Sequence, residues 1–228
     1  MLLGLGITLL IILIFGPQMW SGYVLKRYNT AIDEIPGTGG QLAKHLLTRF
    51  EIDDVNVEPG EQGNDHYDPE GKTIKLSADH YDGKSLTAIV VAAHEVGHAI
   101  QHKAGYGPLF LRWRLAKFTY YAEKIASLIL VIFPFAAMLT HMPVFSILLL
   151  LAGISIMLLP VIVHIITLPV EWDASFQRAL PILIAGEYIP ESAIPIAKKI
   201  LTAAALTYLA ASLSSLLNFY RWITILRR

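Results

Sequence analysis

Long apolar segments constrain the fold of this chain more than any other feature of its sequence. The chain has 228 residues, 54% of them hydrophobic, and a mean hydropathy of +0.53, which is too apolar for an ordinary soluble domain. Four stretches are apolar enough to be considered as membrane spans: Met1 to Met19, Ile125 to Leu139, Val144 to Leu168 and Ile200 to Leu217. We therefore expect a mainly α-helical integral membrane protein with three or four transmembrane helices.

The apolar stretches also predict how the chain is divided. Residues 1–20 lack a charged region before the apolar run and a small-residue cleavage site after it, which indicates a transmembrane signal anchor rather than a cleaved signal peptide. Residues 125–168 hold two apolar stretches with a short connection and predict a transmembrane hairpin. Residues 191–228 predict a helix that either spans the membrane or packs against the other helices at its surface.

Basic residues predict the orientation, since short cytoplasmic segments carry the excess of lysine and arginine. They follow the first apolar stretch, precede the second and follow the third, while the hairpin tip carries none: Lys26, Arg27, Lys103, Arg112, Arg114, Lys117, Arg178, Lys198 and Lys199. This pattern predicts a multi-pass protein of the inner (plasma) membrane with residues 21–124 in the cytoplasm. Acidic and basic residues are equal in number, at 18 each, and no basic tract indicates nucleic-acid binding.

Residues 94–98 read His-Glu-Val-Gly-His and carry the clearest chemical signal. On a helix, the i, i+4 spacing places His94 and His98 on one face, where both imidazoles can bind a single Zn²⁺. Glu95 lies beside that pair and can act as the general base toward a water that the metal activates. The flanking sequence predicts a helix over residues 85–103 that stops near Gly105.

Two other interpretations of this motif were weighed. It can belong to an amphipathic helix with solvated side chains, or to a site that binds a metal without catalysis. Glu95 lies among Ala, Val and Ile, where an unpaired charge is costly to bury, and this favours a functional role. Gly97 lowers helix stability by about 1 kcal/mol relative to alanine, so we expect another backbone or a substrate to approach closely there.

A catalytic zinc usually has three protein ligands, so a third ligand is expected outside the motif. The chain has no cysteine, which leaves histidine and carboxylate side chains. Glu171 is the preferred candidate, because Pro169 suits the first turn of a new helix, predicted over residues 169–190, and places this carboxylate near its beginning. An exposed acid stabilised by the helix dipole is the alternative role for Glu171, and Asp173 and His164 are the alternative ligands.

The polar region before the motif helix predicts a small folded unit. Leu42, Leu46 and Phe50 recur every fourth residue and indicate an amphipathic helix over residues 41–50. Residues 55–57 and 73–77 alternate as short strands do, and the turn-rich sequence between them predicts a β-hairpin. The second strand is the candidate substrate-binding edge, through Thr73, Ile74, Lys75 and Leu76. A strand that merely covers the helix is equally compatible with this pattern.

Three motifs together resemble a known family. Residues 94–101 (His-Glu-Val-Gly-His-Ala-Ile-Gln), 168–175 (Leu-Pro-Val-Glu-Trp-Asp-Ala-Ser) and 65–69 (Asp-His-Tyr-Asp-Pro) are similar to bacterial membrane neutral zinc metallopeptidases of the YugP type. More distantly, the layout resembles membrane gluzincins such as the heat-shock membrane protease and the CAAX prenyl protease. The resemblance implies a small zincin-like domain with one zinc bound by His94, His98 and Glu171, and Glu95 as base.

The resemblance leaves some positions open. The distant relatives carry an aspartate four residues after the ligand glutamate, where this chain has Ser175 and, nearer, Asp173. Either residue is expected to orient a zinc-bound histidine. Arg178 lies two helical turns after Glu171 and is the candidate for stabilising the oxyanion of the tetrahedral intermediate, with His66 and Tyr67 as alternatives. A cytoplasmic anchor is the other role considered for Arg178.

These observations predict a membrane-embedded zinc endopeptidase that hydrolyses membrane-associated or unfolded polypeptides. A site-2-type intramembrane protease is a rival, but the Asp-Gly sequence in this chain, Asp82-Gly83, precedes the motif helix instead of following it on a later span. A membrane scaffold that holds zinc without turnover is the rival from another class. The partners expected are a polypeptide substrate and the lipid bilayer, while the oligomeric state is left open.

Overall fold

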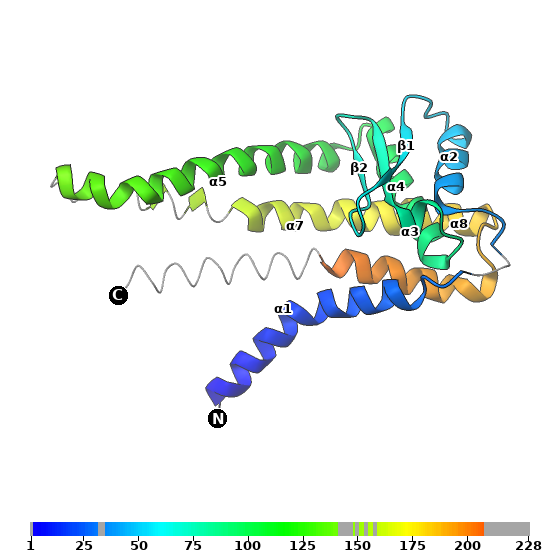
Figure 1. The fold of residues 1–228 in the computed structure, drawn as a ribbon, viewed down its shortest axis with the longest axis horizontal. Coiled ribbons are helices and arrows are strands. Elements are labelled where there is room, and N and C mark those ends of the chain that lie inside the picture. Colours follow the sequence, from blue (N-terminus) through cyan, green and yellow to red (C-terminus); the bar gives the residue numbers. More distant parts are fainter. Residues whose placement is uncertain are drawn as a thin grey trace.

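The computed structural model describes residues 2–31, 35–140, 148, 151–152, 155–156 and 159–207. A compact end contains a small sheet and several helices, and long helices extend away from it (Figure 1). The long helices are α1 (Leu2–Arg27), α5 (Gly107–Thr140) and α7 (Leu159–Trp172), of which α5 and α7 run side by side. The compact end holds α2 (Gly39–Arg49), α3 (Ala78–Tyr81), α4 (Leu86–Lys103) and α8 (Leu180–Ala185).

Helix α2 begins at a capping box. The hydroxyl of Thr38 accepts a hydrogen bond from the backbone N–H of Gln41, whose side chain accepts one from the backbone N–H of Thr38. Leu42 and Leu46 are buried and contribute to the core shared with α4. The helix predicted over residues 41–50 is therefore confirmed, two residues longer at its start.

The sheet has three strands in the order β1-β3-β2. Strand β1 (Asn56–Gly60) pairs with β3 (Thr73–Ser77) in parallel, and β2 (His66–Asp68) pairs with β3 in antiparallel orientation. The predicted hairpin between the first and third of these strands is wrong, because the turn-rich segment between them itself contains a strand. Asp65, just before β2, fixes this strand by accepting hydrogen bonds from the backbone N–H and the hydroxyl of Ser77.

Helix α4 runs through the middle of the compact end. It starts at Ser85, whose hydroxyl accepts a hydrogen bond from the N–H of Ala88. It ends at Lys103, close to Gly105, which has a positive φ of 66°. Fourteen of its residues are buried, so its position is fixed from several sides. The helix predicted over residues 85–103 is confirmed.

Helix α7 continues into a π-helix, η1 (Asp173–Ala179), and then into α8. The sequence predicted that a new helix starts at Pro169, but this proline lies inside α7. The residues before it are apolar and already helical from Leu159, so the chain keeps its direction through the proline. The π-helix places one extra residue in the turn that faces α4, which changes the side chains presented there.

The prediction of three or four transmembrane helices is wrong for the part of the chain that the structure describes. There, one helical run, Leu159–Ala185, is long and apolar enough to cross a membrane. Residues 125–139 form the distal part of α5, and at 1.5 Å per residue they span about 22 Å, short of the roughly 30 Å hydrocarbon core of a bilayer. Residues 141–143 of the predicted hairpin tip lie outside the described residues, as do residues 144–147, 149–150, 153–154 and 157–158 of the third apolar stretch and residues 208–217 of the fourth.

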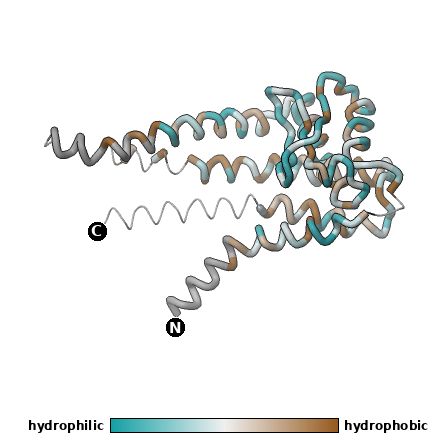
Figure 2. The backbone as a smooth tube through the Cα atoms, viewed as in Figure 1, coloured by the Kyte–Doolittle hydropathy of each residue, from teal (hydrophilic) through white to brown (hydrophobic). Residues whose placement is uncertain are grey.

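Whether the C-terminal apolar stretch spans the membrane or packs against other helices stays a prediction. Leu201, Ala203 and Ala205 are buried within the molecule. Near the other end of the chain, Val24 of α1 is also buried in the core. Hydrophilic residues gather at the end that holds the sheet, while the coloured parts of the long helices carry hydrophobic and hydrophilic residues together (Figure 2).

Candidate active site

The candidate metal centre combines two side chains from α4 with one from the end of α7. Nε2 of His94 lies 3.1 Å from Oε2 of Glu171, and Nε2 of His98 lies 3.4 Å from the same oxygen. Ligand atoms of the three residues all lie within 4.8 Å of one another, and all three residues are buried. Two imidazoles and one carboxylate form a donor set that suits zinc and leaves a position for water or substrate. Among the described residues, the cluster includes neither Asp173 nor His164.

The other ring nitrogen of each histidine has its own partner. Nδ1 of His94 lies 3.1 Å from the hydroxyl of Ser175, and Nδ1 of His98 lies 2.9 Å from Oε1 of Gln101. The amide nitrogen of Gln101 donates to the carbonyl of Val170 and to Oδ2 of Asp173, so its oxygen must face His98. His98 therefore carries its proton on Nδ1 and leaves Nε2 free to bind a metal.

Close packing of α4 on the π-helix makes these contacts possible. A Cβ atom added to Gly97 would lie 2.7 Å from the backbone oxygen of Ala174. Only glycine allows this approach, and the expected close contact at Gly97 is confirmed. Ser175, the next residue of the π-helix, is fully buried against His94 as a result.

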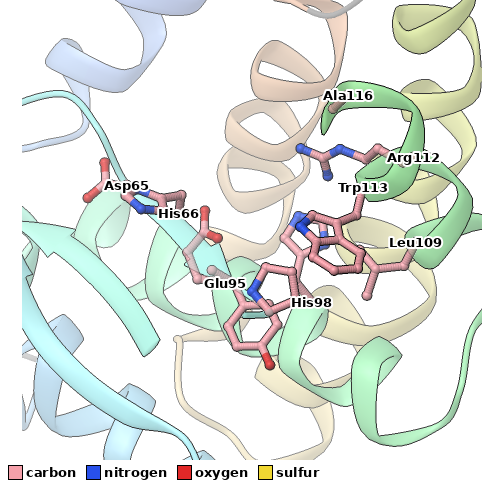
Figure 3. Close-up of a pocket in the computed structure, with 10 residues that line it drawn as sticks. Asp65, His66, Glu95, His98, Leu109, Arg112, Trp113 and Ala116 are labelled. Carbon is pink, nitrogen blue, oxygen red and sulfur yellow. The ribbon is translucent and has the colours of Figure 1, made fainter. Parts of the chain in front are cut away.

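Glu95 lies in a cavity of about 190 Å³ beside the metal cluster. Burial raises the pKa of this carboxyl to about 7, although His94 opposes the shift. The carboxylate of Glu95 points toward Asp65 and His66 (Figure 3). These two residues belong to the β2 segment, residues 65–69, which lies across the cavity from α5. The lining residues come from both sides: Asp65, His66, Tyr67, Pro69, Glu95, His98, Leu109, Arg112, Trp113 and Ala116.

The β2 wall of the cavity is held by two polar contacts. Oδ2 of Asp65 lies 2.8 Å from Nδ1 of His80. Burial opposes ionisation of Asp65, but its hydrogen bonds to His80 and Ser77 prevail and keep the pKa of Asp65 below its ordinary value. The hydroxyl of Tyr67 lies 2.6 Å from Nδ1 of His102, and burial raises the pKa of Tyr67 to about 12.

The opposite wall is the start of α5. Leu109, Arg112, Trp113 and Ala116 follow one another at intervals of three, one and three residues, which places them on one face of the helix. Nη1 of Arg112 donates a hydrogen bond of 2.7 Å to Oε1 of Glu171. The two oxygens of Glu171 are thus divided, Oε2 toward the histidines and Oε1 toward Arg112.

A family described as "Putative neutral zinc metallopeptidase" matches residues 3–227. The chain belongs to this family. It is also 36% identical over 215 residues to "Putative membrane protease YugP" of Bacillus subtilis (strain 168), and the match covers 92% of each chain. No solved structure matches the chain. The family resemblance stated from the three motifs is confirmed, whereas the likeness to more distant gluzincins is not tested.

The structure distinguishes between site residues that the sequence alone left as equal candidates. Ser175 contacts His94 directly, while Asp173 reaches His98 only through Gln101. Nε of Arg178 donates to Oδ2 of Asp173 at 2.7 Å, and Arg112 rather than Arg178 lines the cavity. The proposed oxyanion role of Arg178 thus finds no supporting contact.

The strand predicted to bind substrate does not lie at an edge of the sheet. Thr73, Ile74, Lys75 and Leu76 belong to β3, which is the central strand and pairs with β1 on one side and with β2 on the other. A strand with neighbours on both edges has few backbone groups left for a peptide. The residues that face Glu95 come from the β2 segment instead.

Sequence reasoning assigned no role to two residues of this site. Gln101 lies three residues after His98 on α4, and that helical spacing was a usable signal. Arg112 was counted only among the basic residues that predict orientation. No local pattern relates it to Glu171, because the two are 59 positions apart in the sequence.

Proposed function

We propose that this chain is a zinc-dependent endopeptidase with His94, His98 and Glu171 as its metal ligands. The observation that carries the proposal is the convergence of Nε2 of both histidines on one oxygen of Glu171, with Nδ1 of each histidine engaged elsewhere. This is the arrangement in which imidazoles bind zinc in proteins. Zinc bound there would polarise a peptide carbonyl and lower the pKa of a water.

Glu95 is the proposed acid–base group. Its carboxylate lies next to the two histidine ligands in the sequence, and Glu95 also lines the cavity. It accepts a proton from the attacking water as the oxygen adds to the peptide carbonyl carbon. When the C–N bond breaks, Glu95 passes that proton to the leaving amine. Water and peptide are consumed, and a carboxylic acid and an amine are formed.

The cavity favours polypeptides as substrates. It opens between the β2 segment and α5, and its volume of about 190 Å³ suits one side chain rather than a whole folded protein. A flexible or unfolded chain can place a single residue beside Glu95 while the rest of the chain stays outside. We therefore propose extended segments of membrane-associated or unfolded polypeptides as the substrate class.

The enzyme is proposed to act at a membrane. Large apolar side chains are exposed along the long helices, including Phe15 of α1, Ile125 and Ile132 of α5 and Ile165 of α7. Exposed apolar surface of this extent indicates contact with lipid or a partner protein. The relative from Bacillus subtilis is named a membrane protease, which supports lipid. The expected cytoplasmic position of the active site stays a prediction.

The experiment that tests the proposed function measures zinc content and cleavage of unfolded casein by the protein purified in detergent. Wild type should bind about one zinc per chain and cleave casein. Glu95→Gln should keep its zinc and lose cleavage, and Glu171→Ala should bind zinc more weakly. Glu191→Ala, at an exposed glutamate, serves as the matched control and should behave as wild type. A wild-type protein that binds no zinc, or a Glu95→Gln variant that still cleaves, would contradict the proposal.

A further inference from the structure

Arg112 is held against the candidate metal centre from a separate element, α5. Its Nη1 donates to Oε1 of Glu171 at 2.7 Å, and its side chain is 28% exposed while that of Glu171 is 2% exposed. The contact is a charge-assisted hydrogen bond in a largely water-free place, which is the stronger kind. It restrains the rotation of the Glu171 carboxyl group and thereby keeps Oε2 directed at His94 and His98.

The same guanidinium faces the space where a substrate would bind. Arg112 lines the cavity together with Glu95 and His98 (Figure 3). Of the described residues that line this cavity, Arg112 is the one arginine or lysine. A positive charge therefore contacts the ligand carboxylate and also borders the cavity that holds the proposed base.

Peptide hydrolysis needs a positive charge in such a place. When water adds to the carbonyl carbon, the carbonyl oxygen becomes an oxyanion, and a preorganised cation lowers the energy of that state. The other residues considered for this task have different partners. Arg178 is bound to Asp173, and the hydroxyl of Tyr67 lies against His102.

His66 is the remaining alternative. Its Nδ1 lies 3.0 Å from the backbone oxygen of Asn64, and its ring is on the β2 side of the cavity, next to Glu95. Arg112, by contrast, contacts one of the three proposed ligands directly. Arg112 therefore lies against the proposed metal site itself.

We propose that Arg112 has two functions: it positions Glu171 as a ligand, and it stabilises the oxyanion formed on the substrate. This inference rests on the proposed function and deepens it. The positioning function predicts an effect on zinc affinity, which is measurable without any substrate. The oxyanion function predicts an effect on catalysis that persists when zinc is saturating.

The test compares Arg112→Met, which removes the charge, with Arg112→Lys, which keeps a charge on a side chain of similar length. Arg114→Met, at an exposed arginine of the same helix, is the matched control. For Arg112→Met we expect roughly 10- to 100-fold weaker zinc binding in a chelator competition assay. At saturating zinc we expect kcat/KM to fall roughly 10²- to 10³-fold. Arg112→Lys should recover at least about tenfold of that loss.

A phosphonamidate peptide separates the oxyanion function from a general effect on folding, because its tetrahedral anion imitates the intermediate. Its inhibition constant should rise with Arg112→Met in parallel with the loss of kcat/KM, while binding of an uncleaved product peptide changes little. Unchanged kcat/KM at saturating zinc would overturn the oxyanion function, and unchanged zinc affinity would overturn the positioning function. Weaker phosphonamidate binding in His66→Ala but not in Arg112→Met would assign the oxyanion to His66.

The outcomes remain distinguishable from a failure of the proposed function. If wild type binds zinc but cleaves no peptide, the endopeptidase proposal fails. The zinc affinity of Arg112→Met then still decides whether Arg112 positions Glu171.

Discussion

The side-chain oxygen of Gln101 accepts a hydrogen bond from Nδ1–H of His98, with the two atoms 2.9 Å apart. The amide nitrogen of Gln101 donates to the backbone oxygen of Val170, which directly precedes Glu171. One fully buried amide thus connects a proposed ligand on α4 with the segment that carries the ligand on α7. Gln101 fixes the tautomer of His98 and the distance between the two helices together.

Replacing Gln101 by leucine should weaken zinc binding by roughly 10- to 100-fold, because His98 then lacks the acceptor that fixes its orientation. The change also leaves the buried carbonyl of Val170 without this donor. It should therefore lower the free energy of unfolding by about 1–3 kcal/mol. Chelator competition measures the first effect and denaturant unfolding the second. Zinc affinity equal to that of wild type would show that His98 needs no such partner.

Gly97→Ala should disturb the site one helical turn before Gln101, where α4 packs against the π-helix. The new Cβ would lie 2.7 Å from the backbone oxygen of Ala174, and neither backbone can yield easily. We expect a loss of about 1–3 kcal/mol in unfolding free energy and weaker zinc binding, because Ser175 moves with Ala174. Gly22→Ala is the control, since nothing lies within 4 Å of a Cβ there. If Gly97→Ala melts at the wild-type temperature, the helices are not as closely packed as described.

The contact between Asp65 and His80 predicts that the free energy of unfolding depends on pH in the acidic range. The pKa of Asp65 is lower in the folded protein than its ordinary value, so this carboxylate contributes stability above that ordinary value, and the contribution is lost as the pH falls through the folded pKa. Asp65→Asn should therefore be less stable than wild type at neutral pH. The difference between the two should shrink below about pH 4. Unfolding in the presence of a chelator measures this without interference from metal loss, and a pH-independent difference would contradict it.

Trp113 is predicted to contribute to substrate preference. It lines the cavity beside Leu109, on the face of α5 that lies across the cavity from Glu95. Trp113→Ala enlarges the cavity and removes apolar contact area, so kcat/KM should fall more for peptides with a large apolar residue at the scissile bond than for those with a small one. Phe118→Ala, at an exposed aromatic residue of the same helix, is the matched control. Equal losses for both peptide classes would mean that Trp113 does not contact substrate.

The helix over residues 85–103 and its two histidines were predictable because their signals are local: a cap, a spacing of four and a terminal glycine. Glu171 was proposed because Pro169 was expected to begin a new helix, and it lies against both histidines although this proline lies inside α7. The sheet was not predictable in the same way. Strand β2 is held beside β3 by Asp65 and Ser77, which meet only in the folded chain.

The predicted fold class was wrong because an apolar segment can either face lipid or pack inside the protein. Leu201 and Ala203 are buried inside the protein, although their segment, residues 200–217, was considered apolar enough to face lipid. Composition alone does not separate a helix that packs on protein from one that faces lipid. Arg112 was missed for a related reason. A basic residue near an apolar helix is interpreted as a signal of membrane orientation, and the local sequence gives no sign of a contact with a distant carboxylate.

The most direct test of the central claim is X-ray absorption spectroscopy at the zinc edge on the zinc-loaded protein. The proposed ligand set predicts two imidazole nitrogens at about 2.0–2.1 Å from the zinc and a carboxylate oxygen at about 2.0–2.2 Å. In Glu171→Ala the carboxylate contribution should disappear while both imidazoles remain. A wild-type spectrum without two imidazole ligands, or a carboxylate signal unchanged in Glu171→Ala, would contradict the assignment of His94, His98 and Glu171 as the metal site.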